Sequence, residues 1–234
     1  MPHELIHTLP MRWADLDELG HVNNVTYVDY ACEARDAHVA AGDLSEPEVR
    51  SATVEFLRPL LLSERPVRVT SRLVDGSLVQ EIAPDGASAP FARVTSRAEA
   101  AASEPVGEGA QYALRIRHSD LDPRGVVTLT RMFELAQESR IVALRRLHQE
   151  HGAFGRFVVA RVDVALNEPV TWRPEPYAAR TAVTHVGRKS FTLGTAFEAG
   201  RLGHSHAVLV GFDLGTQQSR VLDDAEREIL SQGC

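Results

Sequence analysis

The chain has 234 residues, of which 44% are hydrophobic and 24% are charged, and its formal net charge is −7. These values describe an ordinary globular protein, long enough for two small domains with cores of their own. The negative charge argues against a broad nucleic-acid surface, and no apolar run approaches membrane-spanning length. The N-terminus has no signal-peptide pattern, and Cys32 and Cys234 show neither metal-ligand nor disulfide spacing. We therefore expect a cytoplasmic protein.

The first half of the chain begins with an expected strand over residues 4–13. An acidic turn of the form Asp-x-Asp-x-x-Gly follows, formed by Asp15, Asp17 and Gly20. A helix is expected over 25–41, because apolar residues extend most of the way round it and Gly42 can end it. Turn signals then separate four further expected strands, over 52–57, 67–74, 78–82 and 91–97.

The second half repeats this order. The acidic turn returns as Asp120, Asp122 and Gly125, at a constant offset of 105 residues, and the match continues into the next expected helix. The chain is therefore predicted to be a tandem repeat. The elements expected in this half are a strand over 112–118, a helix over 128–148, strands over 157–166, 177–186, 190–198 and 204–213, and a short terminal helix over 223–230.

Each copy thus contains one apolar helix and enough strands for one antiparallel sheet. Such a helix can bury its apolar faces only if the sheet curls around it, which predicts an α+β fold. The expected units are residues 1–100 and 111–234, joined by a linker over 101–110. A single unit would expose a sheet edge and apolar surface, so the copies should pack as an intramolecular pseudo-dimer, with assembly into a further homo-oligomer left open.

The residues around the first turn resemble the signature of hotdog-fold acyl-CoA thioesterases of the 4-hydroxybenzoyl-CoA thioesterase type. The resemblance rests on Asp15-Leu16-Asp17, on Gly20-His21-Val22-Asn23-Asn24, and on Tyr27, Glu33 and Arg35. It implies two tandem hotdog units and an acyl-CoA thioester substrate. It implies no metal and no cofactor other than the coenzyme A that the substrate carries.

By this resemblance, the second Asp of each turn, Asp17 or Asp122, is the catalytic carboxylate, acting as a nucleophile or as a base for water. Thioester hydrolysis also needs a donor for the oxyanion. The family places that backbone N–H seven residues after the Asp, on Asn24 in copy one and on Leu129 in copy two. His21 is a further candidate, either positioning substrate or water or serving as a hydrogen-bonded structural residue.

An Asp before a helix is often only a cap or a turn former, and this is the role we favour for Asp15 and Asp120. Glu33 and Glu138 lie within the expected helices. We expect each to form an ion pair with a nearby Arg rather than to act as a general base.

Several cations are suited to the phosphates of coenzyme A, and the candidates are Arg58, Arg188 and Lys189. For any single one of them, however, we favour an ordinary solvated surface charge. Trp13 and Trp172 are expected in the core or lining a pocket.

The sequence therefore predicts an acyl-CoA thioesterase. One rival is a hotdog hydratase or dehydratase, whose carboxylate–His motif is spaced differently from Asp17 and His21. The other is a non-catalytic acyl-CoA binder or sensor, suggested by Val126, which replaces the His in copy two. Release of free thiol from a thioester would argue against both.

Overall fold

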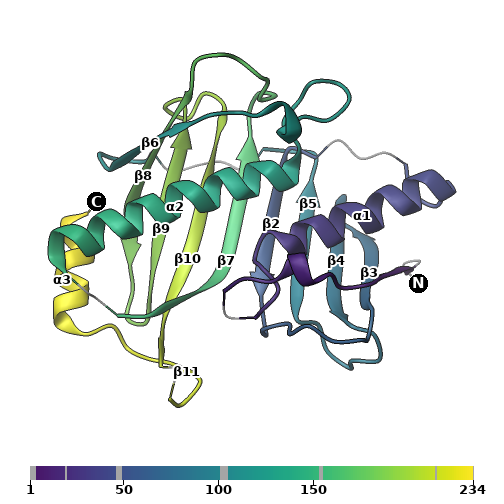
Figure 1. Ribbon diagram of the computed structural model, residues 1–234, viewed down its shortest axis with the longest axis horizontal. Coiled ribbons are helices and arrows are strands. Elements are labelled where there is room, and N and C mark those ends of the chain that lie inside the picture. Colours follow the sequence, from purple (N-terminus) through teal and green to yellow (C-terminus); the bar gives the residue numbers. More distant parts are fainter. Residues whose placement is uncertain are drawn as a thin grey trace. The chain divides into compact units, whose positions relative to one another are not determined.

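The computed structural model describes residues 4–18, 20–45, 49–100, 105–152, 155–213 and 215–233. The chain divides into two compact units, unit 1 over Met1–Ala100 and unit 2 over Ala101–Cys234 (Figure 1). None of the described helices combines the length and apolarity needed to cross a membrane.

Unit 1 is an antiparallel sheet with a helix against it. Its strands lie in the order β1-β3-β4-β5-β2, and α1 contacts β1, β3, β4 and β5. A short 3-10 turn, η1, precedes the acidic turn. The bounds are β1 Leu5–Leu9, η1 Trp13–Asp15, α1 Thr26–Ala41, β2 Ser51–Phe56, β3 Val67–Val74, β4 Ser77–Pro84 and β5 Ala92–Arg97.

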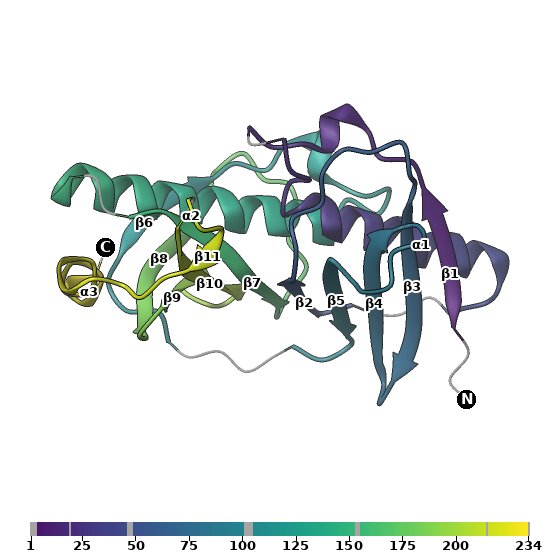
Figure 2. The same cartoon turned by 90° about the horizontal axis from the view of Figure 1, so that it is seen from below.

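Unit 2 has the same plan. Its strand order is β6-β8-β9-β10-β7, which matches unit 1 strand for strand, and Figure 2 shows α2 along one side of these strands. A two-stranded extension and a terminal helix are additions. The bounds are β6 Ala110–Leu114, η2 His118–Asp120, α2 Leu129–His151, β7 Phe157–Leu166, β8 Tyr177–Val186, β9 Ser190–Phe197, β10 Gly203–Asp213, β11 Gln218–Ser219 and α3 Asp224–Gln232.

The core of unit 1 lies between α1 and the sheet. Val28 and Ala34 of α1 are completely buried, and alternate residues of β3 and β4 are buried as a pleated sheet requires. Gln80 is a fully buried polar side chain of this layer, and it is satisfied: it donates to the Ala31 carbonyl at 2.8 Å and to Ser71 Oγ at 3.2 Å. The predicted α+β fold, with each sheet packed around its own helix, is confirmed.

The first strand of each unit is shorter than predicted. β1 ends at Leu9, directly before Pro10, which has no N–H to donate to a neighbouring strand. In unit 2 the expected strand over 112–118 ends at Leu114, and His118 begins the 3-10 turn instead. Each acidic turn is therefore separated from its sheet by several residues of irregular chain.

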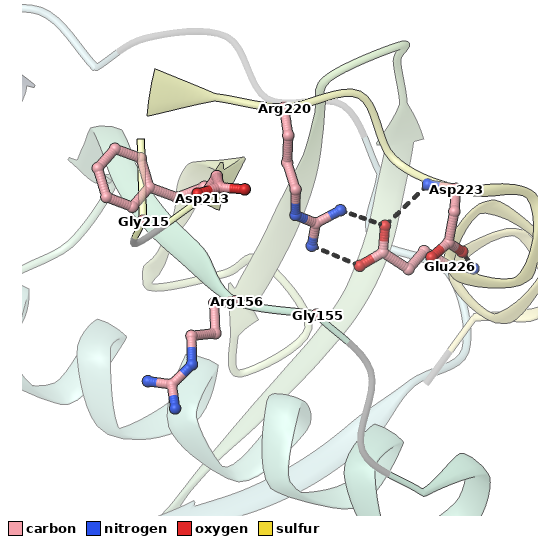
Figure 3. A pocket seen from close by; sticks show the side chains of 8 residues that line it. Gly155, Arg156, Asp213, Gly215, Arg220, Asp223 and Glu226 are labelled. Atoms are coloured by element: carbon pink, nitrogen blue, oxygen red, sulfur yellow. Dashed lines mark hydrogen bonds and ion pairs between the residues drawn. The ribbon is translucent and has the colours of Figure 1, made fainter. Parts of the chain in front are cut away.

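A buried ion pair attaches the terminal helix α3 to unit 2. The guanidinium of Arg220 donates to both oxygens of Glu226, at 2.7 and 2.6 Å, and Glu226 is only 3% exposed (Figure 3). The Asp223 N–H also donates to Glu226 at 2.9 Å. These groups line a pocket of about 580 Å³ at the end of unit 2 where β10 finishes. The pocket's buried carboxylate is thus neutralised by the protein itself.

We predict that Arg220→Met lowers the free energy of unfolding by about 3–5 kcal/mol, because it leaves a buried carboxylate without its partner. Denaturant unfolding measures the difference. Arg227→Met is the matched control, since Arg227 is an exposed arginine of α3 whose side chain donates to the Gly187 carbonyl and pairs with no carboxylate among the described residues. Equal midpoints for the two variants would contradict the prediction.

The same ion pair gives the protein a pH dependence. The hydrogen bond from Arg220, the largest cause, holds the pKa of Glu226 below its ordinary value of 4.5. The stabilisation is therefore complete above pH 4.5 and is lost as the pH falls through the lower folded-state pKa. Unfolding measured between neutral pH and pH 3 should show this loss in the wild type and a smaller loss in Arg220→Met.

Candidate active site

Asp15 organises the first acidic turn. Its Oδ2 accepts the Arg12 N–H and the Tyr30 hydroxyl, both at 2.6 Å. Its carbonyl accepts the Asn23 N–H at 2.8 Å. Burial, and after it the hydrogen bond to Asp15, raise the pKa of Tyr30 above its ordinary value, so the tyrosine remains a donor at neutral pH. Asp15 is thus engaged on several sides, as expected for a turn former.

Asp17 lies where the turn reverses. Its N–H donates to the His21 carbonyl at 2.7 Å, and its Oδ1 accepts the His21 N–H at 3.0 Å. This reciprocal pair links Asp17 to the backbone of His21. Gly20, at a φ of 74°, supplies the left-handed residue that the reversal requires. His21 therefore positions Asp17 through its main chain, whatever its imidazole does.

The residues after the turn leave one backbone donor unused. The Asn23 side chain accepts the Val25 N–H at 3.0 Å, and the Asn23 carbonyl accepts the Thr26 N–H at 2.9 Å. Between them, the N–H of Asn24 has no acceptor among the described residues. α1 begins at Thr26, so Asn24 lies just before the helix, where free N–H groups attract a developing negative charge.

A buried tyrosine that sequence reasoning left without a role also borders this turn. The Leu60 N–H donates to the Tyr27 hydroxyl oxygen at 3.2 Å, which leaves the hydroxyl proton available. Burial, the largest cause, and the charge of Asp17 raise the pKa of Tyr27 to about 12. The signal was present, because Tyr27 belongs to the recognised signature and Met132 stands at its position in unit 2.

The second turn has the same backbone but a different charge environment. The Val126 N–H donates to Asp122 Oδ1 at 3.0 Å, just as His21 does to Asp17. Asp122 additionally binds Arg124, whose Nε and N–H donate to it, each at 2.9 Å. These contacts, the Val126 hydrogen bond first, lower the pKa of Asp122. Leu19 replaces Arg124 in unit 1 and cannot form this ion pair.

The expected oxyanion donor of unit 2, Leu129, is the first residue of α2. Its N–H lies outside the hydrogen-bond ladder of that helix. Thr128 caps the helix by accepting the Arg131 N–H at 3.3 Å. Arg131 also places its Nε 3.8 Å from Asp120, which occupies the position of Asp15. The acidic turn of unit 2 is thus followed by a capped helix, and its first Asp has an Arg side chain nearby.

Of the three candidate phosphate ligands, Arg58 lies beside the acidic turn of its own unit. It comes two residues before Leu60, whose carbonyl accepts the Val22 N–H at 2.8 Å. Arg188 and Lys189 lie at the β8–β9 turn, where Lys189 donates to Ser219 at 3.3 Å. In unit 2 this turn and Asp122 lie at opposite ends of β8, whose ten residues span roughly 30 Å.

Three expectations need correction or comment. Glu33 and Glu138 are exposed, and neither forms an ion pair with a described residue, so the expected pairs with Arg are wrong. Trp13 is 82% exposed and is not a core residue. Among the described residues, no group of three His, Cys, Asp or Glu side chains could hold a metal ion.

Comparison with known proteins agrees with this fold. Residues 11–89 match the model of the thioesterase-like superfamily. A structure described as a putative oleoyl thioesterase from Lactobacillus plantarum is 12% identical with a TM-score of 0.68, covering 90% of this chain and 96% of that chain. A 12:0-ACP thioesterase from Umbellularia californica is 10% identical with a TM-score of 0.63, covering 93% and 94%. No curated protein matches the sequence.

These findings identify the fold. Solved structures of similar length share the fold of the two units, and the matched family segment contains the acidic turn of unit 1. The chain has a hotdog-like fold in both units, and its residues 11–89, which contain the first turn, match the thioesterase-like superfamily.

We predict that Tyr30→Phe lowers the free energy of unfolding by about 1.5–3 kcal/mol, because Asp15 loses a hydrogen bond to its charged oxygen. Tyr112→Phe is the control, since the hydroxyl of Tyr112 has no described partner and its loss should cost little. In a double-mutant cycle with Asp15→Asn, the two losses should be less than additive. Full additivity would show that the contact does not stabilise the turn.

Proposed function

We propose that this protein hydrolyses acyl-CoA thioesters to a free acid and coenzyme A, with Asp17 as the catalytic carboxylate. One observation carries the proposal. The His21 N–H donates to the Asp17 carboxylate, and shortly after it in the chain the Asn24 N–H has no acceptor among the described residues. A carboxylate and an unused backbone donor are the two groups that thioester hydrolysis requires.

Two routes use the same groups. In one, the Asp17 carboxylate attacks the thioester carbonyl carbon, the C–S bond breaks, and water hydrolyses the resulting anhydride. In the other, Asp17 takes a proton from water as the water oxygen attacks that carbon, and the proton finally reaches the departing thiolate. Both pass through a tetrahedral oxyanion, to which the Asn24 N–H would donate. The Tyr27 hydroxyl, protonated at neutral pH, is a second donor near the carboxylate.

Unit 1 is the better candidate for the chemistry. The Val126 hydrogen bond first, and the contacts with Arg124 after it, lower the pKa of Asp122, and a carboxylate of lowered pKa is a weaker base and a weaker nucleophile. Unit 2 also has Met132 where unit 1 has the Tyr27 hydroxyl. Unit 1 carries Leu19 at the position of Arg124, and an apolar side chain cannot form that ion pair. We therefore assign most of the activity to Asp17.

The first test is Asp17→Asn. The carboxamide keeps the size of the side chain and can still accept the His21 N–H, but it is neither a base nor a competent nucleophile. We expect kcat to fall at least about 100-fold on a hydrolysed acyl-CoA, with substrate binding largely retained. Thiol release measures turnover, and calorimetric binding of coenzyme A measures the second property. Unchanged turnover would remove Asp17 from the mechanism.

The second test compares the units through Asp122→Asn, assayed on the same acyl-CoA. We expect a loss several-fold smaller than that of Asp17→Asn, because the ion pair with Arg124 already weakens this carboxylate. Arg124→Leu recreates the unit 1 residue and should leave the activity of Asp17 unchanged. A greater loss from Asp122→Asn would reverse the assignment, and equal losses by half would indicate two working sites.

A further inference from the structure

The most exposed large side chain near the candidate site is Trp13. It begins η1 and comes four residues before Asp17, and 82% of its surface is open to solvent. Tryptophan normally buries a large apolar area or supplies it to a partner. An indole so exposed, beside a site for a substrate that carries a large planar group, is a candidate contact for that group.

At the corresponding position of unit 2, two rings stack on each other. The counterpart of Trp13 is His118, and its ring stacks on Trp172 with a centroid distance of 4.8 Å and an interplanar angle of 20°. The two loops correspond through matching bonds: Val127 N–H donates to the Val170 carbonyl as Val22 donates to that of Leu60. By this register Leu62 stands where Trp172 stands in unit 2. Unit 1 therefore keeps one ring of the stack and lacks the other.

The charge beside this position also differs between the units. Arg12 and Arg58 are exposed, and neither forms an ion pair with a described residue. The Arg58 guanidinium lies 5.8 Å from the centre of the Phe91 ring. Its counterpart by the same register is Glu168, which pairs with Arg201. Unit 1 thus combines an uncovered ring with unpaired positive charge, whereas unit 2 has a covered ring and a neutralised carboxylate.

We propose that Trp13 stacks on the adenine of the coenzyme A substrate, with Arg12 and Arg58 beside its phosphates. The inference rests on the proposed function, since it names the part of the acyl-CoA that unit 1 recognises. Base–aromatic stacking suits an exposed indole, and Arg suits phosphate. The Cα atoms of Trp13 and Asp17 are at most about 14 Å apart along the chain. The pantetheine arm and pyrophosphate of coenzyme A can bridge that distance.

This assignment predicts that the effect of mutating Trp13 depends on whether the substrate carries adenine. Trp13→Ala should raise KM for an acyl-CoA about tenfold and leave kcat nearly unchanged, because stacking on a remote base contributes to binding in the ground and transition states alike. KM for the pantetheine thioester of the same acyl group, which has no adenine, should not change. Trp13→Phe should restore most of the affinity. Equal effects on both substrates would overturn the assignment.

A binding measurement tests the same contact without turnover. Trp13 and Trp172 are the two tryptophans of the chain, so a Trp172→Phe protein reports on Trp13 alone. Adenosine 3′,5′-bisphosphate should quench its fluorescence saturably, and pantetheine should not. Asp17→Asn should keep the quenching, and Arg58→Gln should weaken it. Absence of quenching would overturn the inference even if acyl-CoA is hydrolysed, whereas quenching without hydrolysis of any acyl-CoA would sink the proposed function alone.

Discussion

The candidate site depends on one constraint, the closure of each acidic turn by its own carboxylates. The first Asp accepts a backbone N–H at the start of the turn, and the second accepts the N–H four residues later. These bonds hold the chain in its reversal. The preceding strand does not support the reversal, since several irregular residues separate that strand from the turn. A carboxylate aimed by main-chain donors keeps its direction while neighbouring side chains vary. This is why His21 and Val126 serve the same geometric purpose.

The two units illustrate how one backbone can carry unequal chemistry. Both place a carboxylate before a helix whose first N–H groups lack intrahelical acceptors. In unit 2 the carboxylate is matched by Arg124, and the buried position near it carries the thioether of Met132. In unit 1 the same places hold Leu19 and Tyr27. Both units thus keep the acidic turn, while the side chains around its second carboxylate differ.

Sequence reasoning was most successful where local chemistry dominates. The bounds of β3, β7 and β8 are those predicted, because alternating apolar residues and flanking turn residues mark buried strands clearly. It was least successful where packing decides. The ion pairs expected for Glu33 and Glu138 are not formed with described residues, since helical spacing places an Arg nearby without orienting it. Trp13 was expected in the core or lining a pocket on its residue type alone, and residue type does not show that the Trp13 side chain of η1 is 82% exposed.

The sequence by itself determined the repeat, the acidic turns and the plan of one helix against one antiparallel sheet in each unit, because these follow from residue type and spacing along the chain; the hotdog fold was implied by the family resemblance. Only the tertiary structure decided which donors the turns leave unused. Among the described residues the Asn24 N–H has no acceptor, whereas Asn23 accepts the N–H groups of Val25 and Thr26. Likewise, Arg58 lies beside the acidic turn of unit 1, whereas Arg188 lies at the end of β8 opposite to the acidic turn of unit 2. Such differences depend on where the folded chain returns in space, and a linear pattern does not contain that information.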